Sequence, residues 1–163
     1  MKENKNPNSH PIARAIGMDE MVPLIRESLA ANGCAILPVR GVSMLPFLKE
    51  GRDSVVLAEA AKPPKKRDIV LYQRADGSYV LHRIASVGET YTCIGDAQFV
   101  FEKGIEPSQL IARVTAIKRN GRLSKVGNPI YRLSVWFWII TRPMRHFLKR
   151  AVRKLRRLLV KKK

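Results

Sequence analysis

Residues 68–87, DIVLYQRADGSYVLHRIASV, contain two strand-like runs on either side of the turn sequence ADG. Asp-Gly between two apolar runs is a signal for a β-hairpin. Because side chains alternate along a strand, His82 shares one face with Val80 and Ile84. This segment therefore predicts a hairpin that carries a histidine among apolar neighbours.

Similar short runs lie on both sides of this hairpin. Each is four to nine residues long and rich in apolar or β-branched residues, and no run alternates with a helical pattern. Short strands at this spacing are typical of a compact, coiled antiparallel β domain. We therefore predict a mainly β fold over residues 34–122, with further strands at 34–40, 53–58, 90–94 and 110–118.

The chain before this domain divides into two parts. Residues 1–17 are polar and interrupted by prolines, which predicts a disordered arm with neither a signal peptide nor a membrane span. Residues 18–33 follow a helical period, with Met21, Ile25 and Leu29 on one face and a Gly33 stop signal. We expect an amphipathic helix there.

Charge is distributed unevenly along the chain. The net charge is +18, and 16 of the 31 Lys and Arg residues fall in residues 118–163, which contain no Asp or Glu. Such a polycationic tail is expected to seek an anionic surface.

The tail also has a helical apolar pattern. Residues 133–140, LSVWFWII, are almost wholly apolar, and Pro143 interrupts the helical period that continues beyond them. The run is too short to span a bilayer, which predicts a helix lying in the membrane interface with Trp136 and Trp138 at headgroup depth. We expect residues 130–163 to be a basic amphipathic tail that holds the protein peripherally on the cytoplasmic face of an anionic membrane. The alternatives are that residues 133–140 pack on the β domain, or that the basic end is solvated and disordered.

Three residues in the β region carry groups suited to hydrolysis. Ser43 lies in a tight turn after an apolar strand, His82 lies in the central hairpin, and Asp96 follows the run 90–94. A serine hydroxyl needs a base to become a nucleophile, and a neutral imidazole is a suitable base near pH 7. Cys34 and Cys93 have no metal-binding spacing, and we predict neither a metal nor a cofactor.

The boxes GVSMLP (41–46), RDIV (67–70), LHRI (81–84) and GDA (95–97) occur in an order that resembles the type I signal peptidase family. The likeness is to the branch with histidine in place of the usual lysine, and self-cleaving repressors of the LexA type share that fold. The resemblance implies Ser43 as nucleophile, His82 as general base and Asp96 as the acid that orients the imidazole. The family often has a second acid after the aspartate; Glu102 is the nearest candidate, and we leave it out of the predicted site.

The same resemblance implies a peptide or precursor protein as substrate. The strands at 34–40 and 78–84 offer edges on which an extended peptide can add. We assign Gly41, Met44 and Leu81 to the substrate-binding surface. Gly41 stands where some family members place a hydroxyl that donates to the oxyanion, so one such donor is missing here.

Two other functions remain open from the sequence. The chain is either an inactive relative that binds peptides, or a basic protein that binds nucleic acid through its tail. We do not favour nucleic acid, because the tail aromatics lie beside aliphatic residues and residues 1–33 are too short for a helix-turn-helix domain. The sequence leaves the oligomeric state open.

Overall fold

The computed structural model describes residues 17–59 and 62–160 of the 163-residue chain. The strands are β1 (Cys34–Pro38), β2 (Asp53–Ala58), β3 (Ile69–Gln73), β4 (Tyr79–Val87), β5 (Tyr91–Ile94), β6 (Glu102–Ile105), β7 (Leu110–Arg119) and β8 (Arg122–Lys125). The helices are α1 (Met18–Asn32), α2 (Pro129–Ile140) and α3 (Arg142–Val160), with one 3₁₀ turn at Pro107–Gln109.

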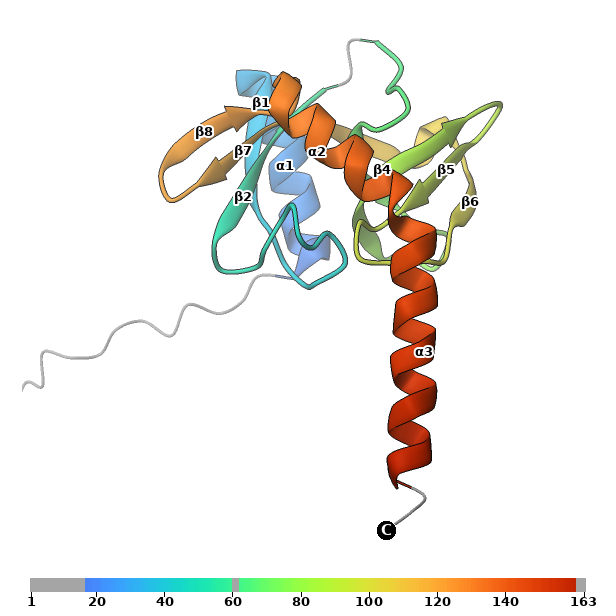
Figure 1. Cartoon of the computed structure of the whole chain (residues 1–163). Helices are drawn as coiled ribbons and strands as arrows, with labels where there is room; N and C mark the ends of the chain where they lie inside the picture. The colour runs from blue at the N-terminus through green and yellow to red at the C-terminus, as the bar shows by residue number, and fades with distance from the viewer. Residues whose placement is uncertain (1–16, 60–61, 161–163) are drawn as a thin grey trace, which may run out of the picture.

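All eight strands belong to one antiparallel sheet. The order is β1-β2-β7-β3-β4-β5-β6, and β8 pairs with the last part of β7. Register shifts in four of the strand pairs bend the sheet. Figure 1 shows the result, with α1, β1, β2, β7 and β8 on one side and β4, β5 and β6 on the other. The predicted mainly β class is confirmed.

The strand β3 is the centre of the sheet and is buried on both faces. Ile69 and Leu71 belong to the larger apolar cluster, with residues of α1, β1, β2 and β7. Val70 and Tyr72 belong to a second cluster, formed with β4, β5 and β6. This explains why residues 69–72 form a continuous apolar run rather than an alternating one.

The helix α1 covers one end of the larger cluster. Ile25 and Leu29 are buried, as the helical period predicted, and Val22 is buried beside them. Pro23 is the sixth residue of α1 and not part of its first turn, so the helix lacks the hydrogen bond that an N–H at this position would donate to the carbonyl four residues earlier. The disordered arm predicted for residues 1–17 lies outside the described residues, apart from Gly17.

Two strands had no counterpart in the sequence prediction. Residues 102–105 (EKGI) and 122–125 (RLSK) each contain a single large apolar side chain, so neither has a strand-like apolar period. Both form because a neighbouring strand supplies the hydrogen bonds: β5 pairs with β6, and β7 pairs with β8. The first of these strands begins at Glu102.

The end of the chain is helical and changes direction at Thr141, just before Pro143. In Figure 1, α2 crosses the sheet and α3 projects away from it. Among the described helices, none combines the length and hydropathy that a membrane crossing needs.

Candidate active site

Ser43 lies in the turn-rich segment between β1 and β2. Its side chain is partly exposed, whereas the next residue, Met44, is only 3% exposed and anchors the turn in the larger apolar cluster. The Leu48 N–H donates to the Met44 carbonyl at 3.0 Å, and the Leu45 N–H donates to the Val42 carbonyl at 3.3 Å. Within the described residues the Ser43 N–H has no acceptor, which leaves it free to face an oxyanion.

A second turn, after β5, holds the Ser43 turn in place. The Ala97 N–H donates to the Ser43 carbonyl at 2.9 Å. Gly95 lies so close that a Cβ at this position would be 2.7 Å from the same oxygen. Only glycine lets the two backbones approach this closely without a shift. The GDA box is therefore a structural neighbour of the serine.

The His82 ring is 1% exposed and meets two oxygen atoms through Nδ1. Glu102 Oε1 lies 3.2 Å from Nδ1, and the Tyr72 hydroxyl lies 3.3 Å from it. The Tyr72 hydroxyl donates its own hydrogen to Glu102 Oε2 at 2.6 Å, so both neighbours accept from the ring. The proton of the neutral ring is thereby placed on Nδ1, and Nε2 keeps its lone pair.

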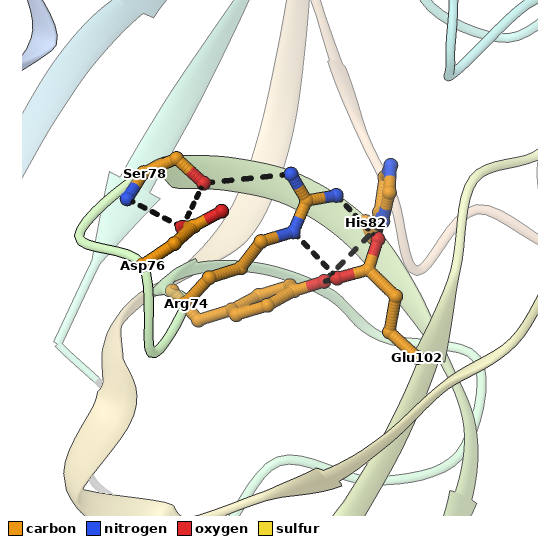
Figure 2. A network of polar contacts seen from close by, with 6 residues as sticks. Arg74, Asp76, Ser78, His82 and Glu102 are labelled. Carbon is orange, nitrogen blue, oxygen red and sulfur yellow. Dashed lines mark hydrogen bonds and ion pairs between the residues drawn. The ribbon is translucent and has the colours of Figure 1, made fainter.

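Arg74 completes this network. Its guanidinium donates to both oxygens of Glu102, at 2.8 Å from Nε and 2.5 Å from Nη2. These hydrogen bonds hold the pKa of Glu102 below its usual range. Figure 2 shows the carboxylate between Arg74 and His82, with the second ring nitrogen of His82 pointing away from it.

The pKa of His82 is lowered from its ordinary value. Burial is the main cause, Arg74 acts in the same direction, and the Glu102 carboxylate partly opposes both. The ring is therefore neutral at pH 7. A neutral imidazole with a free Nε2 is the state that a general base requires.

Asp96 is not placed at His82, which corrects the role that the sequence suggested for it. Its carboxylate forms two hydrogen bonds with Arg83, at 2.8 Å and 2.7 Å. Asp96 is fully buried and Arg83 is 2% exposed. Because His82 and Arg83 are consecutive in β4, their side chains point to opposite faces. The acid that reaches His82 is Glu102, which the sequence prediction left out.

The helix α2 packs over the Asp96 turn and the segment that follows Ser43. The Trp138 Nε1–H donates to the Asp96 carbonyl at 2.8 Å, and Arg83 donates to the Tyr131 hydroxyl at 3.1 Å. Phe47 makes edge contacts with the rings of Tyr131 and Trp138. The half-buried Trp138 thus packs on the β domain, as in the alternative prediction for residues 133–140.

Ser43 and His82 line one cavity of about 320 Å³. Met44 and Leu81, which the sequence analysis assigned to the substrate-binding surface, also line it. Gly41, the third residue predicted for this surface, is not among the lining residues. It is exposed, and its N–H donates to the Glu50 carboxylate at 2.9 Å. Among the described residues no hydrogen bond joins the Ser43 hydroxyl to His82. Catalytic hydrogen bonds are often open until substrate binds.

Two strand edges border this cavity. Its lining includes Leu37 and Pro38 of β1 and residues 79–82 of β4. In the described sheet β1 pairs only with β2, and residues 79–82 pair only with β3 because the pairing with β5 begins at Arg83. Each strand therefore has one free edge with unused backbone donors and acceptors. Such edges suit an extended peptide.

The two cysteines differ in environment. Cys34 is exposed at the start of β1, whereas Cys93 in β5 is fully buried. Burial, with a smaller contribution from Glu102, raises the pKa of the Cys93 thiol to about 12. Both are free thiols.

Comparison of the chain with protein-family models, with curated proteins and with solved structures finds no match.

Proposed function

We propose that this protein is a serine endopeptidase of the signal peptidase type, with the coiled β fold of that family. The observation that carries the proposal is the shared cavity of Ser43 and His82, with Glu102 bound to the far nitrogen of the imidazole. A nucleophile, a base and an acid that orients the base form the arrangement that activates a serine hydroxyl. The acid in this proposal is Glu102 and not Asp96.

In the proposed reaction His82 Nε2 takes the proton of the Ser43 hydroxyl as Oγ attacks the carbonyl carbon of the substrate. The Glu102 carboxylate stabilises the imidazolium that forms, and the Ser43 N–H faces the oxyanion. The imidazolium then gives its proton to the leaving amine, and an ester to Ser43 remains. A water molecule, deprotonated by the same nitrogen, hydrolyses the ester.

The two free strand edges support a peptide or precursor protein as the substrate. A peptide held between β1 and β4 would present its backbone to both strands, and residues such as Met44 and Leu81 would contact its side chains. Pro38 removes one backbone donor from the β1 edge, so β4 offers the more complete set.

The test is peptide cleavage by purified Ser43→Ala and His82→Ala proteins. We expect each substitution to lower kcat by about 10⁴-fold or more, because neither residue replaces the other. Ser86→Ala is the matched control, since Ser86 is an exposed serine on the same strand as His82. Full cleavage by the Ser43→Ala protein would contradict the proposal.

A peptide-binding role without hydrolysis is the second candidate, and it is favoured because no hydrogen bond joins the Ser43 hydroxyl to His82 among the described residues. The same experiment separates the two. Binding is the function if two results are found together. The wild-type and Ser43→Ala proteins bind an extended peptide with the same affinity, and the wild-type protein cleaves no peptide at any pH from 5 to 9.

A further inference from the structure

The helix α2 has an inner face and an outer face of different character. On the inner face Val135 is 2% exposed, and Tyr131 and Trp138 bond to the β domain. On the outer face Leu133 is 65% exposed and Phe137 is 62% exposed. Residues four apart share one side of a helix, so the two outer side chains are neighbours. The helix is thus fixed to the domain on one side and apolar toward solvent on the other.

Further large apolar side chains are exposed on α3, the helix that follows. These large apolar side chains of α2 and α3 are aliphatic, aromatic or sulfur-containing, and each is at least 44% exposed. Exposed apolar patches of this kind mark sites that contact another molecule or a membrane. We call this surface the apolar stripe; it consists of Ile130, Leu133, Trp136, Phe137, Ile140, Met144, Phe147, Leu148 and Val152.

Basic side chains border the apolar stripe. Arg67 and Arg132 line one groove together with Leu133 and Trp136. The loop before β3 is also basic, because residues 62–67 have the sequence KPPKKR. Where α2 meets α3, Arg142 Nε and Nη2 and Arg145 Nε are buried without a hydrogen-bond partner among the described residues. Arg67 and Arg132 therefore place positive charge beside the part of the stripe that lies on α2.

We propose that the apolar stripe and its basic border are a docking surface for an anionic phospholipid bilayer. Apolar side chains would enter the acyl boundary, Trp136 would lie at the level of the headgroups, and the arginines would meet lipid phosphates. A second copy of the chain fits less well, because two segments with 16 basic residues and no acid would face each other. Nucleic acid would leave the aliphatic part of the stripe without a partner.

Docking would also fix the orientation of the β domain. The apolar stripe includes the outer face of α2, and the inner face of the same helix bonds to Asp96 and Arg83. The domain would therefore sit on the membrane at a set angle rather than on a loose tether. This proposal concerns binding alone and does not depend on peptidase activity.

The test is co-sedimentation of the full chain with vesicles of phosphatidylcholine and phosphatidylserine at 7:3, and with phosphatidylcholine alone. We expect binding to the anionic vesicles and at least tenfold weaker binding to the neutral ones. Raising the salt should weaken binding without abolishing it, because salt screens the charges but not the apolar contact. Leu133→Asp and Phe137→Asp should each reduce binding at least tenfold.

Leu123→Asp is the matched control, since Leu123 on β8 is 63% exposed against 65% for Leu133 and the charge change is identical. The proposal fails if this control loses as much binding as Leu133→Asp, or if neutral and anionic vesicles bind equally. It also fails if the chain self-associates without lipid and Leu133→Asp abolishes that association, because a second copy would then be the occupant. Binding to duplex DNA that exceeds vesicle binding would equally overturn it.

Discussion

Two consecutive residues of β4, His82 and Arg83, are each paired with a carboxylate, and the surroundings of the two pairs differ. The difference suggests a catalytic role for one pair and a structural role for the other. The pair of His82 and Glu102 borders a cavity, and the His82 ring keeps one nitrogen without a partner among the described residues. The pair of Arg83 and Asp96 is almost fully buried, and its hydrogen bonds are saturated. A satisfied buried pair holds a fold together, whereas a partly open pair has capacity left for a substrate.

The comparison also shows how a strand divides two tasks between its faces. Arg83 reaches Asp96, the Arg67 carbonyl and Tyr131, and so connects the sheet to the loop before β3 and to α2. His82 reaches Glu102 and Tyr72 on the other face. If this division holds, substitutions in one pair should change folding, and substitutions in the other should change chemistry.

The largest effect is expected from Asp96→Asn. It leaves the buried charge of Arg83 without its counter-ion, which costs about 3–5 kcal/mol of unfolding free energy. Chemical denaturation measures this loss. Asp76→Asn is a fitting control, because Asp76 is an exposed turn residue. A stable Asp96→Asn protein with lost activity would mean that Asp96 acts in the chemistry after all.

Glu102→Gln should give the opposite result. We expect kcat to fall, because the imidazolium formed during the reaction loses its carboxylate partner. The unfolding free energy should change by no more than about 1 kcal/mol, since Glu102 is 23% exposed. Steady-state kinetics gives kcat and chemical denaturation gives the unfolding free energy, and both are compared with the values for Asp96→Asn. The control is Glu89→Gln, because Glu89 lies in an exposed turn. A large loss of stability with unchanged kcat would reverse the assignment of the two pairs.

The smallest effect is expected in the pH dependence of kcat/KM. Activity should rise with pH as His82 loses its proton, with a midpoint below 6.5 because burial lowers the pKa of the ring. Glu102 favours the protonated ring, so Glu102→Gln should move the midpoint further down. Profiles of the residual activity from pH 4 to 9 measure the shift. An upward shift would show that Glu102 does not contact the base.

The sequence predicted much of this arrangement but assigned the wrong acid to the base. The hairpin of residues 68–87, the α1 helix and four other strands follow from apolar periods, which depend on local residue types. The partner of His82 depends instead on β6, whose residues EKGI contain no such period. That strand forms only because β5 lies beside it, where Cys93 pairs with Glu102. Tertiary pairing of this kind leaves little trace in a single sequence.

One signal in the sequence pointed the right way. His82 and Arg83 are adjacent in a strand, so a buried Arg83 needs an acid of its own on the opposite face. Two acids, Asp96 and Glu102, were available as partners for His82 and Arg83, which lie on opposite faces of the strand. Alternation alone cannot decide which acid serves which base, because both follow β5 along the chain. The turn after β5 decides it by holding Asp96 under Arg83.

The difference between the two cysteines has a practical consequence for the study of the cleft. A maleimide dye attacks the thiolate, so the buried Cys93 with its raised pKa should stay unmodified while Cys34 reacts. Cys34 begins the strand whose other end borders the cavity, about 13 Å from Pro38 along an extended chain. The native protein therefore has a single reactive thiol on the strand that borders the cavity of Ser43 and His82. A fluorophore there would report the arrival of a peptide on the free edge of β1 without any engineered residue.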